Sequence, residues 1–215
     1  MVADEVLMDL VIERSVTFGS QSGNAEVRPP FVRLTDAGRD LIKTSQPHNF
    51  DPEDYVGYLR TLAPHLDDAT AQYALEALRA FRQNLLFASA VMIGAAAETE
   101  ILRLLQATTI WEPDTSRKQL LGDLLDRGRL PAIFGAINDS VEAARKQGMP
   151  YDVHQGTTTH LLSLQEMIRV QRNDAVHPAA GRVSRSKVLL SLQSFPAAFE
   201  SAERLYGWFS NHPNP

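Results

Sequence analysis

The sequence lacks cysteine entirely, and it lacks any long hydrophobic run. Without cysteine, disulfides, thiolate metal ligands and a cysteine nucleophile are all excluded. The most apolar stretch, Leu85 to Ala97, spans about 13 residues, whereas a membrane-spanning helix needs about 20. The first 15 residues carry acidic side chains where a signal peptide would carry Lys or Arg. These absences predict a cytoplasmic protein with no membrane segment.

Positive charge is scarce as well, since 21 Lys and Arg residues face 26 Asp and Glu residues. The formal net charge of −5 argues against a protein that coats duplex DNA through a broad basic surface. It leaves room for a local basic patch. Hydrophobic residues make up 44% of the 215 residues, which predicts one domain of ordinary size around a core.

What the chain does contain, from about residue 51 onward, is helical periodicity. Capping residues, glycines and prolines predict where the helices begin and end. We expect an all-α bundle over residues 51–215, preceded by an arm over residues 1–50. The expected helices open at Asp51–Pro52; cover 69–107, as one helix or as two joined near Gln83–Asn84; run from Asp114 or Thr115 to Gly128; cover 130–146; run from Thr157 to about Val176; and run from Ser184 or Ser186 to Phe209, with a kink at Pro196.

The arm is rich in Gly, Pro, Ser and Asn, and its short alternating stretches predict a β-hairpin or an extended segment against the bundle. Its fragment "VRLTDAGRDLI" resembles the last strand of a winged-helix domain. Only about 30 residues precede that fragment, which is too few for the rest of such a domain. An ordered arm is therefore the favoured interpretation, and a DNA-reading wing is the alternative.

The stretch "FASAVMIGAAAETEILRLL", residues 87–105, is apolar almost all round in its first half and predicts a helix in the middle of the bundle. Glu98 shares a face with Gly94, so we expect it to continue a core-facing stripe. A carboxylate there is costly unless a cation or a hydrogen-bond donor meets it. Two interpretations stay open: a structural ion pair, or a contact that orients Arg172. Glu100 is expected to point elsewhere, into solvent.

A second polar group lies in "QRNDAVHP", residues 171–178. Asn173 and His177 are four residues apart, which places them on one face of a helix. Pro178 disfavours helical geometry at His177, so that histidine is expected at the helix end or just past it. There it can turn toward the groove that Arg172 also borders.

An Arg followed by four to six residues and a His is weak evidence on its own, because 17 Arg and six His residues yield about one such pair by chance. A second pair, Arg60 and His65, is interpreted as a helix end with a surface histidine. Around the pair at 172–177, five basic residues oppose two acidic ones, a local charge of +3: Arg169, Arg172, Arg182, Arg185 and Lys187 against Glu166 and Asp174. Such an island beside a histidine suits binding and cleavage of a phosphodiester. A solvated basic loop is the alternative.

On these residues the chain resembles the HEPN superfamily of helical domains. "QRNDAVHP" matches that family's Arg-x4-His motif, and "FASAVMIGAAAETEIL" is similar to its other recurrent helix, in which small residues run into a glutamate. The likeness covers about residues 51–209. It implies a helical bundle that dimerises. It also implies a metal-independent endoribonuclease of the kind that serves toxin–antitoxin and antiphage defence systems.

The resemblance assigns roles residue by residue. Arg172, Asn173 and His177 match the motif, and Glu98 matches the glutamate of the other helix. His177 would move protons at the 2′-hydroxyl or the 5′-oxygen of RNA, Arg172 would hold the scissile phosphate, and Asn173 would orient His177 or the ribose. The products would be a 2′,3′-cyclic phosphate and a 5′-hydroxyl. A twofold dimer would supply these groups in duplicate, in a composite site.

The expected partners are RNA (single-stranded or tRNA), a second copy of the chain, and an antitoxin or other defence protein. RNA contacts are expected from four basic residues: Arg169, Arg182, Arg185 and Lys187. No cofactor is expected. No metal is expected either, because the spacing of His154 and His160 fits no helical metal pair.

Other aromatic and apolar residues are interpreted as packing groups. Trp111 and Trp208 lie in apolar contexts and are expected to pack rather than to stack on bases. The apolar residues of the last helix are expected in the core or in a dimer interface: Leu189, Leu192, Phe199, Leu205 and Trp208. Two other functions stay open: a noncatalytic HEPN-like module that dimerises and binds a nucleotide, RNA or protein, and a DNA-binding regulator that uses the arm.

Overall fold

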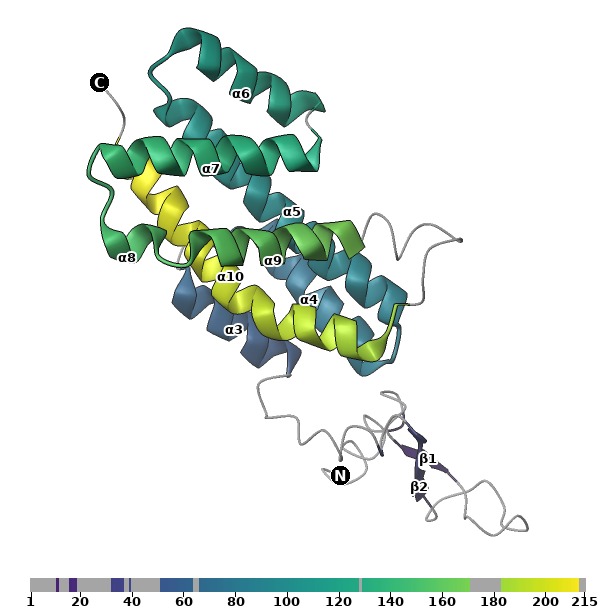
Figure 1. Cartoon of the computed structure of the whole chain (residues 1–215). Coiled ribbons are helices and arrows are strands. Elements are labelled where there is room, and N and C mark those ends of the chain that lie inside the picture. Colours follow the sequence, from purple (N-terminus) through teal and green to yellow (C-terminus); the bar gives the residue numbers. More distant parts are fainter. Residues whose placement is uncertain are drawn as a thin grey trace.

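The computed structural model describes residues 11, 16–18, 32–36, 39, 51–63, 66–127, 129–170 and 183–212. Within them the architecture is helical, with one short antiparallel hairpin near the N-terminus (Figure 1), so the predicted all-α class with an N-terminal hairpin is confirmed. No helix in the described part of the chain is long and apolar enough to cross a membrane. The elements are β1 Val16–Phe18, β2 Val32–Leu34, α3 Pro52–Leu62, α4 Asp68–Arg82, α5 Leu86–Trp111, α6 Thr115–Arg127, α7 Leu130–Lys146, α8 Tyr151–His154, α9 Thr157–Arg169 and α10 Arg185–Asn211.

The starts of α3, α4 and α10 follow the capping signals of the sequence. Asp51 accepts hydrogen bonds from the backbone of Glu53 and Asp54 at the start of α3, and Asp67 accepts one from Thr70 at the start of α4. At the start of α10, the hydroxyl of Ser184 accepts from the backbone N–H of Lys187 at 3.3 Å. The short α8 between α7 and α9 was not predicted.

The expected region 69–107 is two helices, and Asn84 makes the break between α4 and α5. Asn84 adopts a left-handed backbone with φ of 59°, which asparagine tolerates better than most residues. The N–H of Asn84 donates to the carbonyl of Phe81 at 3.0 Å, and the N–H of Leu85 donates to that of Ala80 at 2.8 Å. These two bonds form a Schellman cap, so α4 ends with its last carbonyls satisfied.

Helix α5 lies in the middle of the bundle, as predicted, and packs against α4, α6, α7, α9 and α10. In Figure 1 it crosses behind α9 and α10 on its way from α4 to α6. Its small residues Ala90 and Ala97 are buried, and the hydroxyl of Ser89 donates to the carbonyl of Ala77 on α4 at 2.7 Å. The small Ser89 side chain therefore lies where α5 packs against α4.

Helix α10 contains Pro196, which has no backbone N–H to donate to the carbonyl of Leu192. The hydroxyl of Tyr55 on α3 donates to that carbonyl instead, at 2.7 Å in the core. Burial raises the pKa of Tyr55, which keeps the phenol protonated and able to donate. The proline thus creates an acceptor that joins α10 to α3.

The core confirms much of the expected packing. Leu192, Phe199 and Leu205 on α10 are fully buried, and burial of each such side chain contributes about 1.5–3 kcal/mol. Trp111 is buried as well, with its ring centroid 5.2 Å from that of Phe209 in an edge-on contact. Trp111 is therefore a packing residue, as predicted.

Candidate functional site

The predicted catalytic motif falls largely outside the described residues. Arg172, Asn173 and His177 belong to the segment 171–182, as does Arg182, so their geometry stays a prediction. The structure does describe the residues on either side of this segment. Val170 and Val183 are 7% and 6% exposed, so both ends of the segment are held by side chains in the core.

At the upstream end, Arg169 pairs with Glu166 one turn earlier on α9. Its Nε and Nη2 atoms each donate to a carboxylate oxygen at 2.7 Å. The hydrogen bond from Arg169 lowers the pKa of the Glu166 carboxyl, and the positive charge of Lys187 on α10 lowers it further. We call Glu166, Arg169 and Lys187 the charged cluster; its two cations and one carboxylate give a net charge of +1.

At the downstream end, Arg185 docks on the turn between α4 and α5. Its Nη1 atom donates to Asn84 Oδ1 at 3.1 Å and approaches the carbonyl of Phe81 at 3.4 Å. The guanidinium also lies over the Phe81 ring, 4.2 Å from the centroid. A cation at the carboxyl end of α4 is favoured by the helix dipole. This anchoring role was not predicted, and an RNA contact by Arg185 stays a prediction.

Glu98 lies half-buried on α5, on a face that is buried at Gly94 but open nearer the start of the helix. Phe87, eleven positions earlier on that face, is 54% exposed. The prediction that Glu100 is solvated was wrong, because Glu100 is 0% exposed. The buried stripe of α5 passes through positions Ile93, Ala97, Glu100 and Leu104. Whether Glu98 orients Arg172 stays a prediction.

Glu100 belongs to a buried polar group centred on Arg103. The Nη1 atom of Arg103 lies 2.9 Å from Glu100 Oε2, 2.6 Å from Glu203 Oε1 and 3.6 Å from Asp67 Oδ2. Desolvation raises the pKa of Glu100 well above its ordinary value, and the negative charge of Glu203 raises it further. We call Asp67, Glu100 and Glu203 the carboxylate cluster. Through Arg103 it joins α5 to α10 and to the N-cap of α4.

A groove of about 400 Å³ lies between α9 and α10, beside the charged cluster. Leu162 and Leu190 on its two sides are 57% and 66% exposed. The hydroxyls of Ser191 and Ser194 donate hydrogen bonds to carbonyls of their own helix. They therefore add little polar character to the groove. The groove is lined by Thr159, Leu162, Ser163, Glu166, Met167, Leu190, Ser191 and Ser194. We call it the α9–α10 groove.

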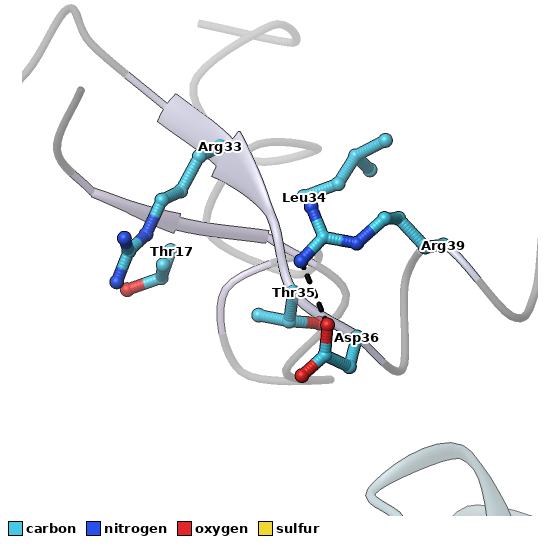
Figure 2. Close-up of a pocket in the computed structure, with 6 residues that line it drawn as sticks. All are labelled: Thr17, Arg33, Leu34, Thr35, Asp36 and Arg39. Carbon is cyan, nitrogen blue, oxygen red and sulfur yellow. Dashed lines mark hydrogen bonds and ion pairs between the residues drawn. The ribbon is translucent and has the colours of Figure 1, made fainter. Parts of the chain in front are cut away.

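The hairpin carries a second, more polar pocket, shown in Figure 2. Arg33 on β2 extends beside Thr17, its cross-strand partner on β1. Arg39 pairs with Asp36 at 2.7 Å. The pocket therefore offers one arginine beside hydroxyl groups, and a nucleic-acid contact by the arm stays a prediction.

Among the residues that the structure describes, no group of three or more His, Asp or Glu side chains is placed to hold a metal ion. His154 instead packs edge-on against Tyr151, with ring centroids 5.4 Å apart.

The chain has no significant match to a family model, to a curated protein or to a solved structure. Its function is therefore inferred from the motif at 172–177 and from the packing of α5, α9 and α10 on either side of it.

Proposed function

We propose that this protein is a HEPN-type endoribonuclease that cleaves RNA by attack of the substrate's own 2′-hydroxyl group. The observation that carries the proposal is the motif Arg172–Asn173–His177 in the connection between α9 and α10. Both helices pack against α5, the helix that carries Glu98. This arrangement agrees with the two helical segments on which the resemblance to the family rests.

The chemistry follows from the residue types. RNA supplies the nucleophile, so the protein needs a proton carrier that titrates near neutral pH and a cation for the phosphorane oxygens. His177 is the proton carrier, and the forked guanidinium of Arg172 holds the scissile phosphate. Asn173 orients the histidine or the ribose. Cleavage leaves a 2′,3′-cyclic phosphate and a 5′-hydroxyl.

The charged cluster supports binding of the RNA backbone beside the motif. Arg169 and Lys187 lie on the helices that flank the segment 171–182, and the cluster keeps a net charge of +1. An incoming phosphate can replace Glu166 as the partner of Arg169, because both present paired oxygens to the guanidinium. Arg182 adds a cation within the segment, whereas Arg185 chiefly anchors the start of α10 to the α4–α5 turn.

A composite site requires a second copy of the chain, and the α9–α10 groove is the surface that we assign to it. Leu162 and Leu190 are exposed on the two helices that lead into and out of the motif. Packing of this surface against its twofold copy buries both leucines and brings the two segments 171–182 toward each other. Each active site then contains an arginine and a histidine from both copies.

The proposal is tested by incubating purified protein with total RNA and with tRNA in EDTA. Wild type is expected to cleave, while Arg172→Ala and His177→Ala are expected to cleave about 10²–10⁴-fold more slowly. Arg60→Ala is the matched control, since Arg60 and His65 form the other Arg-x4-His pair of the chain. Cleavage that persists in both motif variants, or that disappears equally in Arg60→Ala, contradicts the assignment.

The exposed α9–α10 groove also favours a second candidate, a noncatalytic HEPN-like module that dimerises and binds a nucleotide, RNA or protein. The two candidates differ in living cells. A ribonuclease effector of a cytoplasmic toxin–antitoxin or defence system arrests growth when overproduced, and His177→Ala abolishes the arrest. A binding module has no such effect in either form.

A further inference from the structure

The carboxylate cluster contains more negative charge than its one cation can balance. Arg103 is the only cation in contact with Asp67, Glu100 and Glu203 among the described residues, so full ionisation would leave a net charge of −2, three carboxylates less one guanidinium. Glu100 is 0% exposed and the side chain of Glu203 only 10% exposed. Buried charge without a partner is costly, and a carboxyl group in such a place takes up a proton instead.

The hydrogen bonds of the cluster indicate which group takes the proton. Arg103 donates to Glu100 Oε2 and to Glu203 Oε1. The second oxygen of Glu100, Oε1, is buried and accepts no hydrogen bond. An ionised carboxylate only accepts hydrogen bonds, whereas a protonated one also donates. A proton therefore gives the Glu100–Glu203 pair the donor that it lacks.

We propose that Glu100 and Glu203 share one proton at neutral pH, and that this proton stabilises the packing of α5 against α10. The negative charges of Glu203 and Asp67 favour the protonated form of Glu100, while the charge of Arg103 opposes it. Arg103 lies 4.6 Å from the ring centroid of Tyr206 on α10, so that phenol also borders the cluster. With the proton in place, the cluster carries a net charge of −1, two carboxylates less one guanidinium.

The shared proton makes stability depend on pH with a definite sign. In the unfolded chain a glutamate releases its proton near pH 4.3, whereas in the folded protein Glu100 keeps it to a higher pH. The stabilisation is therefore complete below about pH 4.3 and is lost as pH rises through the raised pKa. Within that window, each pH unit increases the unfolding equilibrium constant by up to about tenfold.

Infrared spectra of the full chain test the proton directly. At about pH 7 ordinary glutamates are ionised and give no C=O band of a protonated carboxylic acid. Wild type is expected to show that band because of the shared proton, and to lose it at alkaline pH. Glu100→Gln is expected to remove the band. Glu142→Gln is the matched control, because Glu142 pairs with an arginine three positions away, as Glu100 does, but is exposed; this variant is expected to keep the band.

Two results overturn the proposal: no acid band in wild type at neutral pH, or a band of full intensity in Glu100→Gln. If Glu100→Gln does not fold, Glu203→Gln supplies the second variant. Its amide can donate to Glu100 and adds no charge, so Glu100 is expected to release its proton at lower pH than in wild type. If Glu100 releases its proton at the same pH in Glu203→Gln as in wild type, the proton is not shared.

Discussion

At the scale of single residues, the contact between Tyr55 and Leu192 shows how one side chain completes another element's backbone. Pro196 removes the N–H that would normally bond to the carbonyl of Leu192, and the phenol of Tyr55 replaces it at 2.7 Å. A buried carbonyl without a partner is costly. The helix-breaking residue is thus tolerated in the core because a neighbouring helix supplies the donor.

This account predicts that Tyr55→Phe destabilises the protein by about 1–3 kcal/mol, because the Leu192 carbonyl is left unpaired. In a Pro196→Ala background the same change costs less, since residue 196 then donates its own N–H. Urea unfolding of the four proteins in this double-mutant cycle measures the coupling. Tyr58→Phe is the control at an exposed tyrosine of α3. Equal costs in both backgrounds are incompatible with the replacement.

At the scale of elements, Arg185 connects the start of α10 to the end of α4. It lies directly after the Ser184 cap of α10, close in sequence to the predicted catalytic segment. Its contacts with Asn84 and with the ring of Phe81 hold the start of α10 against the bundle. Under the proposed function, we expect Arg185 to be a positioning residue for the motif.

Arg185→Ala is accordingly expected to destabilise the protein by about 1–2 kcal/mol and to lower cleavage activity. Arg185→Lys keeps the positive charge but lacks the planar guanidinium. Compared with Arg185→Ala, it should therefore recover only part of the lost stability. Thermal unfolding and the cleavage rate, measured on the same samples, check both statements. A role in RNA binding alone predicts the opposite pattern, with lost activity and unchanged unfolding.

The sequence predicted those elements whose signals are local. Residues 130–146 were expected as a helix and form α7. The Ser184 cap and the break near Asn84 were each one of two expected alternatives. In each case the decisive atoms lie within a few positions of each other, in a cap or a turn.

The sequence did not predict contacts between groups that lie far apart along the chain. Arg103 pairs with Glu100 on its own helix and also meets Glu203, a hundred positions later. On a helix that is apolar nearly all round, the local pattern does not decide which face turns to the core. The sequence therefore predicted the buried carboxylate at Glu98 and not at Glu100. The docking of Arg185 on Asn84, 101 positions away, has the same origin.

At the scale of the whole molecule, the α9–α10 groove predicts how two copies meet. Burial of an exposed leucine contributes about 1.5–3 kcal/mol, so an arginine at position 190 should prevent association. Light scattering is expected to show a dimer for wild type and a monomer for Leu190→Arg. Leu120→Arg, at a leucine of α6 that is 58% exposed, is expected to stay dimeric. A monomeric wild type, or a dimeric Leu190→Arg, contradicts this interface.

The most direct test of the central claim compares one RNA with the same strand carrying 2′-deoxyribose at the cleavage site, in EDTA. If the 2′-hydroxyl is the nucleophile and His177 moves its proton, wild type cleaves only the ribose strand and leaves a 2′,3′-cyclic phosphate, and His177→Ala cleaves neither. Cleavage of the deoxyribose strand, or a 5′-phosphate on the products, would show that water attacks instead and that the role assigned to the motif at 172–177 is wrong.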